Sequence, residues 1–222
     1  MPALHSWIPS TEVAFIAQLS DKEINRAVDE DVLPTTLYQR TDGRRFARIT
    51  AVFAKFYFDA AEQLTRTLRR EVIETLTSRL MQRPDHDAVL ELGVWNVPMD
   101  WKVQLQFGWI DLERFVKLSK ARAARLDRAH RTVVEDSGIL GGMPVFAGTR
   151  IPIEAVLASK NAGMSAESIA ESYPSVTPEQ IDDAEAYLEA HPRRGRPRKR
   201  LDESSPHWRR ISHKVVVPPK TA

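Results

Sequence analysis

A stretch dense in turn-forming residues, SGILGGMPVFAGTRIPIEAVL at 137–157, constrains the fold more than any other part of this sequence. Its glycines permit backbone angles that other residues avoid, and its prolines fix φ at the starts of strands and helices. The residues concerned are Gly141, Gly142, Gly148, Pro144 and Pro152. We expect a tight hairpin, PVF against TRI, leading into a helix that carries Pro152 in its first turn.

Two further helices are expected after this turn. The first begins at Ser165 and stops before Pro174. The second opens with Thr177 as N-cap, a proline at the first helical position and Gln180 as capping-box partner. With a short strand at 132–134 ahead of it, this segment resembles a three-helix unit of homeodomain size.

The first 49 residues are predicted to form a winged helix-turn-helix. Apolar residues mark two short helices with a turn at 18–20 between them, and Ser20 with Glu23 forms a capping box for the second. Two strand-like runs then surround Thr41-Asp42-Gly43, a glycine-containing hairpin loop. Helix, turn, helix and hairpin is the order of that fold.

The middle region, residues 50–131, mixes helix and strand. Apolar spacing over 50–83 indicates one long helix or two, and the runs AVLELGVW and WKVQLQFGW alternate like strands joined through 96–100. A helix over 112–131 has a basic face, which either contacts phosphate or is simply solvated. The basic face comprises Arg114, Lys117, Lys120, Arg125, Arg128 and Arg131. Candidate homodimer surfaces are the apolar stripe at 53–76 and the edges of the 88–109 sheet.

The predicted fold class is therefore mainly α with small β elements, or α+β. Its parts are a winged helix-turn-helix at 1–49, a helical and β-hairpin middle region at 50–131, a helix-turn-helix-like domain at 132–191 and a basic extended tail at 192–222.

The net charge of +2 hides a division between body and tail. Residues 193–222 hold ten Lys/Arg and two Asp/Glu, a charge of +8, which leaves 22 and 28 in residues 1–192, a charge of −6. Such a basic arm is typical of polyanion or partner binding.

Two interpretations of the tail stay open. Its RGRPRK run resembles an AT-hook, whose arginines enter a narrow minor groove, here Arg194, Arg196 and Arg198. The following HWRRISHKVVVPP run alternates apolar anchors with cations, which favours an extended peptide that binds a protein.

No residues with enzyme chemistry are found. There is no cysteine, and the six histidines show no metal-ligand spacing, so we expect no metal, no cofactor and no catalytic site. The Asp85-His86-Asp87 group is interpreted as a loop. Neither a signal peptide nor a membrane-length apolar run is present, which predicts a cytoplasmic protein that does not enter membranes.

The C-terminal segment resembles a small bacterial domain of unknown function with a GTRIP-type signature, G-x-P-V-x-x-G-T-R-I-P-V, then G-x-S-x-E-x-I, Y-P and T-x-E-x-I-x-x-A-x-x-Y. It departs at Met143, where lysine is usual, and Ile153, where valine is usual. The matching residues are Gly142, Pro144, Val145, Gly148, Thr149, Arg150, Ile151, Pro152, Gly163, Ser165, Glu167, Ile169, Tyr173, Pro174, Thr177, Glu179, Ile181, Ala184 and Tyr187.

This resemblance implies an antitoxin of a VapBC-type module, whose partner is a PIN-domain ribonuclease toxin. PIN active sites hold carboxylates around magnesium, so a tail with arginines between apolar anchors suits them. The toxin-binding residues expected on this basis are Trp208, Arg209, Arg210, Ile211, Val215 and Val217.

The resemblance also implies that the antitoxin represses its own operator, and a homodimer would match paired half-sites. The second helix is acidic, so we expect the wing to carry most DNA contacts. The charged residues of that helix are Asp21, Glu23, Asp29, Glu30 and Asp31 against Lys22 and Arg26. The DNA-binding candidates in the body are Asn25, Arg26, Arg40, Arg44, Arg45 and Arg48. The alternative is a stand-alone DNA-binding regulator with an AT-hook-like tail, and the N-terminal unit is alternatively a protein-interaction module.

Overall fold

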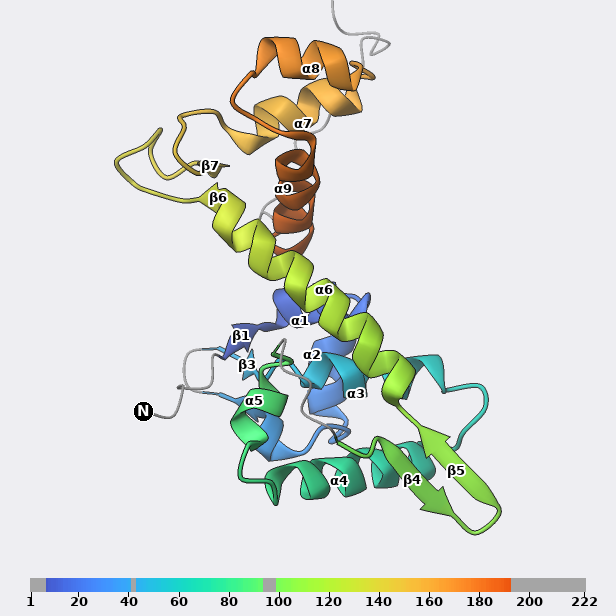
Figure 1. The fold of residues 1–222 in the computed structure, drawn as a ribbon. Coiled ribbons are helices and arrows are strands. Elements are labelled where there is room, and N and C mark those ends of the chain that lie inside the picture. The colour runs from blue at the N-terminus through green and yellow to red at the C-terminus, as the bar shows by residue number, and fades with distance from the viewer. Residues whose placement is uncertain (1–6, 41–42, 94–98, 193–222) are drawn as a thin grey trace, which may run out of the picture. The chain divides into compact units, whose positions relative to one another are not determined.

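The computed structural model describes residues 7–40, 43–93 and 99–192. These residues are mainly helical with three small antiparallel sheets, so the α+β class is confirmed (Figure 1). The α-helices are α1 Ser10–Ala17, α2 Asp21–Asp29, α3 Thr50–Asp59, α4 Arg66–Met81, α5 His86–Leu90, α6 Glu113–Thr132, α7 Ile153–Asn161, α8 Ala166–Ser172 and α9 Pro178–Ala190. The strands are β1 Ile8–Pro9, β2 Tyr38–Gln39, β3 Arg45–Phe46, β4 Lys102–Leu105, β5 Gly108–Asp111, β6 Val133–Val134 and β7 Val145–Phe146, and η1 is a short 3₁₀ helix at Thr35–Leu37.

The first two helices follow the local signals in the sequence. Gln18 takes a left-handed conformation that ends α1, with φ of 54°. The Glu23 amide donates to Ser20 Oγ at 3.2 Å, and the Ser20 amide donates to Glu23 Oε2 at 2.8 Å. This capping box confirms the predicted start of α2 because both backbone donors of the first turn are satisfied within four residues.

The expected hairpin forms, and a third strand joins it. Phe46 of β3 lies opposite Tyr38 of β2 on one side and opposite Ile8 of β1 on the other. Phe46 is fully buried, so the sheet closes one side of the core around α1 and α3. The tip residues 41 and 42 lie outside the described residues.

The apolar region at 50–83 forms two helices, α3 and α4. Thr65 begins the second by accepting a hydrogen bond from the Leu68 amide at 3.3 Å. The stripe proposed above as a dimer surface is buried inside the chain itself, with Phe53, Ile73 and Leu76 fully buried. That interpretation was wrong, because a stripe of this width is equally what a core-facing helix requires.

The strand expected over AVLELGVW, residues 88–95, is also wrong for its described part, 88–93, because residues 86–90 form α5. The Ala88 and Val89 amides both bond to the Asp85 carbonyl, which starts a helical turn directly after Pro84. Over so few residues the apolar pattern fits both the helical and the strand periodicity. The second run, WKVQLQFGW, supplies strand β4, the turn and the start of β5 on its own, with Val103 opposite Ile110.

Helix α6 is the central element of the described chain. It packs against α3, α1 and α9 (Figure 1), with Phe56 of α3 beside Phe115 near its start and Glu12 of α1 beside His130 near its end. Residues between Ile8 and Ala129, joined by Ala186 and Ala190 of α9, make one hydrophobic core. A second core, around Phe146, Ile153 and Ile169, lies within residues 133–184.

The glycine-rich turn has the expected form. The Phe146 amide donates to the Ile151 carbonyl at 3.0 Å, and Val145 bridges to Pro152 in antiparallel fashion. Gly148 sits in the turn with φ of 75°, a conformation that favours glycine. Pro152 is the N-cap of α7, one residue before the predicted first turn. Strand β7 also pairs with β6, with Val133 opposite Phe146.

Replacing the N-cap of α9 is expected to destabilise the chain measurably. Thr177 Oγ1 accepts from the Gln180 amide at 3.3 Å, and the Thr177 amide donates to Gln180 Oε1 at 2.9 Å. Thr177→Ala should lower the free energy of unfolding by about 1 kcal/mol, measured by urea denaturation. The matched control is Thr67→Ala at an exposed position of α4, which removes no cap. An equal effect of both substitutions would contradict the role of the cap.

Candidate functional site

The predicted DNA-binding residues of the body divide into two groups. Arg44 is half-buried and bound to the chain itself: its guanidinium donates to Asn25 Oδ1 at 3.1 Å and to the Asn25 carbonyl at 3.0 Å, and it also pairs with Asp29. The Asn25 amide in turn donates to the Asp21 carbonyl at 2.8 Å. Arg44 and Asn25 therefore link the β2–β3 hairpin to α2.

Arg48 has a similar internal role. Its side chain is only 13% exposed and lies 2.6 Å from Asp127 Oδ1 and 3.9 Å from Glu91 Oε2. Burial opposes ionisation, but the hydrogen bond and charge of Asp127 raise the pKa of Arg48 above its ordinary value. The pair fixes the segment after β3 to α6.

The remaining cations of this group lie at the surface. The Arg26 guanidinium stacks 4.8 Å from the centre of the Phe58 ring and approaches Glu30 at 3.7 Å. Arg40 lies 5.5 Å from the centre of the Tyr38 ring, and Arg45 is exposed on β3. These three arginines, rather than Arg44 or Arg48, present guanidinium groups that a phosphate can reach.

The basic face of α6 is partly used within the chain. Arg125 donates to the Asp182 carbonyl at 3.1 Å and Arg128 lies 3.5 Å from Asp183, so both contact α9. Lys117 pairs with Glu113 at 2.8 Å on its own helix. For the other three cations of this face, Arg114, Lys120 and Arg131, contact with phosphate stays a prediction.

Both sets of tail residues lie outside the described residues. These are the AT-hook-like arginines Arg194, Arg196 and Arg198, and the predicted toxin-binding residues Trp208, Arg209, Arg210, Ile211, Val215 and Val217. The Asp85-His86-Asp87 group is described: Asp85 binds Arg83 at 2.7 Å, and His86 Nδ1 lies 2.8 Å from the Arg83 carbonyl. These contacts stabilise the start of α5.

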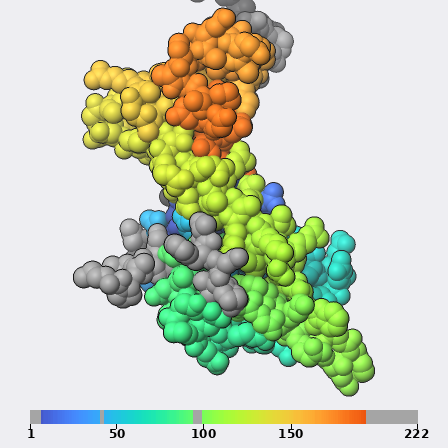
Figure 2. Space-filling view, in the orientation of Figure 1, coloured from blue at the N-terminus to red at the C-terminus, as the bar shows by residue number. Residues whose placement is uncertain are grey.

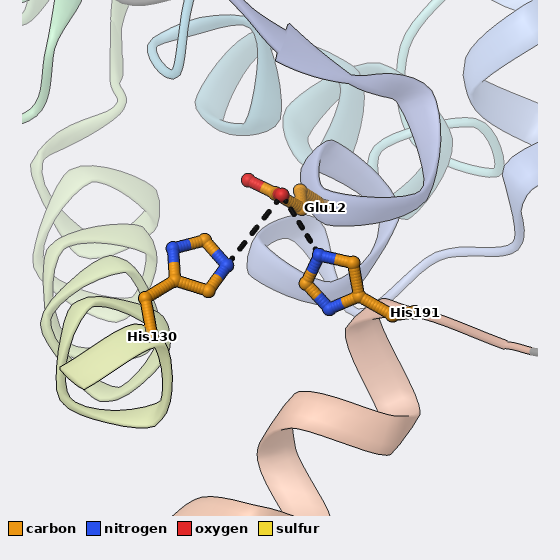
Figure 3. A group of neighbouring side chains, drawn as sticks. All are labelled: Glu12, His130 and His191. Atoms are coloured by element: carbon orange, nitrogen blue, oxygen red, sulfur yellow. Dashed lines mark hydrogen bonds and ion pairs between the residues drawn. The ribbon is translucent and has the colours of Figure 1, made fainter. Parts of the chain in front are cut away.

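A cluster of three polar side chains, which no sequence motif indicates, comes together only in the tertiary structure. Glu12 of α1, His130 of α6 and His191 at the end of α9 point their polar atoms at one another (Figure 3). Glu12 Oε1 lies 3.0 Å from His191 Nε2 and 3.6 Å from His130 Nε2. The Glu12 side chain is 8% exposed, whereas those of His130 and His191 are 35% and 29% exposed. The cluster is thus buried at the carboxylate and open at the histidines.

A second layer of contacts orients His191. Its Nδ1 lies 3.0 Å from the Tyr187 carbonyl, and its ring stacks on the Tyr187 ring with centroids 4.4 Å apart. Tyr187 Oη donates to Glu135 Oε1 at 3.0 Å. Burial and this bond raise the pKa of the Tyr187 phenol, which keeps it a neutral donor.

The two histidines differ in electrostatic environment. Burial lowers the pKa of His130, with the charge of Glu12 opposing it. Burial, the largest single effect, also acts against a charged His191, but the hydrogen bonds to Glu12 and to the Tyr187 carbonyl, together with the charges of Glu12 and Glu135, raise the pKa of His191. No local motif announces the cluster, since Glu12 and His191 are separated by 179 positions.

Comparison with known proteins covers most of the chain. Residues 133–188 match the family model described as a protein of unknown function (DUF433). The uncharacterized protein y4eO of Sinorhizobium fredii (strain NBRC 101917 / NGR234) is 34% identical over 200 residues, which span 89% of this chain and 87% of that protein. The chain belongs to the y4eO family. The segment of this chain that matches DUF433 lies within residues 132–191, where the sequence predicted a small domain of unknown function.

One solved structure also aligns with this chain. The X-ray crystal structure of Rv2018 from Mycobacterium tuberculosis is 15% identical and aligns with 78% of this chain and 94% of that chain, at a TM-score of 0.35. No described helix of the family member is both long and apolar enough to cross a lipid bilayer.

Proposed function

We propose that this protein is a non-enzymatic antitoxin that neutralises a PIN-domain ribonuclease through its C-terminal tail. The observation that carries the proposal is the segregation of charge, +8 in residues 193–222 against −6 in residues 1–192. The described body uses many arginines internally, among them Arg44, Arg48 and Arg122. The tail is therefore the main concentration of cations for an acidic partner.

The chemistry of the tail suits a carboxylate-lined ribonuclease site. Arg209 and Arg210 stand between the apolar residues Trp208 and Ile211. An arginine presents a planar fork that binds a carboxylate in two places, and such pairs are strong when water is excluded. The aromatic and aliphatic neighbours supply the buried anchors that make a peptide interface stable.

We further propose that the protein binds its own operator as a homodimer. Helix α1, the turn, α2 and the β2–β3 hairpin follow the order of a winged helix-turn-helix, which supports this proposal, and we assign the helix-turn-helix-like unit that the resemblance implies to α7, α8 and α9. The exposed Arg40 and Arg45 favour the wing as the DNA contact. The hairpin of β4 and β5, which stands out at the surface in Figure 2, carries Phe107 and Trp109 with exposures of 93% and 63% and is the apolar surface offered for the dimer.

Removing a wing arginine tests the DNA contact. Arg45→Ala is expected to weaken binding to the DNA upstream of the gene by about 1–3 kcal/mol if a base contact is lost, measured by fluorescence anisotropy at fixed salt. Arg70→Ala is the matched control, since Arg70 is an exposed arginine on α4 that pairs with Glu74 at 3.8 Å. Equal affinities of the Arg45 variant and the parent would move DNA binding away from the wing.

The alternative function is a stand-alone DNA-binding regulator. The RGRPRK run favours it, because arginines beside a glycine fit a narrow minor groove. If about four of these cations neutralise phosphates, log K should fall with log salt at a slope near −3.6, and the slope should flatten when the tail is removed.

Co-purification tests the proposed function directly. The full-length protein is co-expressed with the product of the neighbouring gene, and any complex is assayed for ribonuclease activity. A stable, inactive complex supports the antitoxin. The absence of any complex, with salt-dependent binding to AT-rich duplex, would favour the stand-alone regulator instead.

A further inference from the structure

We propose that Glu12, His130 and His191 form a binding site for a divalent transition-metal ion, with Zn²⁺ as the ligand. The three donor atoms, one carboxylate oxygen and two imidazole nitrogens, all lie within 4.8 Å of one another. Two histidines and one glutamate are a known zinc donor set, and nitrogen-rich sets discriminate against Mg²⁺ and Ca²⁺. The site is independent of the toxin and DNA contacts proposed above.

The distances between the donors match the size of the ion. Zinc bonds to nitrogen and oxygen of roughly 2.0–2.2 Å at a tetrahedral angle require ligand atoms about 3.3 Å apart. The observed separations from Glu12 Oε1, 3.0 Å to His191 Nε2 and 3.6 Å to His130 Nε2, lie on either side of this value. The three donor atoms lie within 4.8 Å of one another, so rotation of the histidine side chains has to bring the two imidazole nitrogens together before all three donors surround one ion.

The hydrogen bonding of His191 provides a second, independent argument. Its Nδ1 donates to the Tyr187 carbonyl at 3.0 Å, so a neutral ring presents the lone pair of Nε2 to Glu12. A lone pair facing a carboxylate oxygen at 3.0 Å is repulsive unless a cation lies between the two atoms or the ring carries a second proton. An imidazole whose other nitrogen binds a backbone carbonyl is the usual arrangement of a zinc ligand.

The charges around the cluster also favour a cation. Glu12 is buried, and Glu135 is linked to it through Tyr187 and His191. The neighbouring cation Arg48 is neutralised by Asp127 at 2.6 Å and by Glu91 at 3.9 Å. A bound ion would join α1, α6 and α9, and it would hold the last helix against the N-terminal core immediately before the tail begins.

The test is a titration of the full-length, chelator-treated protein with Zn²⁺ by calorimetry, repeated with Co²⁺ by visible absorption. One site is expected, and His130→Gln should weaken it by about 100-fold or more, since loss of even an outer partner of a zinc ligand typically costs 10–100-fold. His130 is the most exposed of the three ligands, which makes this the variant best suited to remain folded. Zn²⁺ should raise the thermal midpoint of the parent but not of His130→Gln, and Mg²⁺ should do neither.

Two controls separate this site from other histidines. His86→Ala lies outside the cluster, and the double change His207→Ala with His213→Ala removes the histidines of the tail; both variants should bind zinc as the parent does. A second ligand variant, His191→Ala, should lose the site in the same way as His130→Gln. Undetectable zinc binding by the parent, equal affinity in His130→Gln, or loss of binding with the tail histidines would overturn the proposal and leave the cluster as a protonated histidine–glutamate contact.

Discussion

A chain that ends at Pro192 is expected to lose neutralisation of the PIN-domain toxin completely while keeping its fold. The truncation removes every predicted toxin-binding residue and eight units of positive charge. The described core contains no residue after Ala190, so the truncated chain should retain the stability of the parent. Toxin neutralisation is measured as residual ribonuclease activity at equal concentrations of the two proteins, and folding by circular dichroism.

Point variants locate the effect within the tail. Trp208→Ala should weaken toxin binding by at least about 2 kcal/mol, as expected of a buried aromatic anchor. Arg210→Ala should cost about 2–5 kcal/mol if its carboxylate partner is left buried and unpaired. The matched control is Arg198→Ala in the AT-hook-like run, which should change DNA affinity and not toxin binding. Full neutralisation by the truncated chain would place the toxin contact on the folded body.

A large loss of stability is expected from Phe146→Ala. Phe146 is fully buried in the second core, where it lies opposite Val133 and closes the glycine-rich turn through its bond to Ile151. Truncating a buried phenylalanine leaves a cavity and should lower the free energy of unfolding by about 3–5 kcal/mol, measured by urea denaturation. The segment at 133–184 should lose amide protection first, because its core is separate from the larger one.

The matched control is the neighbouring strand residue Val134, which is 40% exposed. Val134→Ala should change the free energy of unfolding by less than about 0.5 kcal/mol, as is usual at the surface. If Phe146→Ala lowered the free energy of unfolding by less than about 1 kcal/mol, that result would contradict an independent second core. Uniform loss of amide protection along the whole chain would show that the two cores unfold together.

The sequence by itself determined the elements whose signals are local. The caps at Ser20 and Thr177, the helix start at Ser165, the glycine turn at 141–152 and the long helix near 112–131 were all predicted to within a few residues. Each depends on hydrogen bonds between residues two to five positions apart, which a short stretch of sequence contains in full. The strand predicted over residues 88–95 was wrong in its described part, since a short apolar run without a cap fits both the helical and the strand periodicity.

Which polar side chains contact one another depends on tertiary packing. The sequence offered Arg44 and Arg48 as DNA contacts, but packing gave them Asp29 and Asp127 as partners. No spacing rule connects Glu12 with His130 and His191, because their approach depends on how α1, α6 and α9 pack together. Local hydrogen bonds determine where a helix begins and ends, whereas the burial of apolar faces determines which helices touch, and the candidate site lies at such a contact.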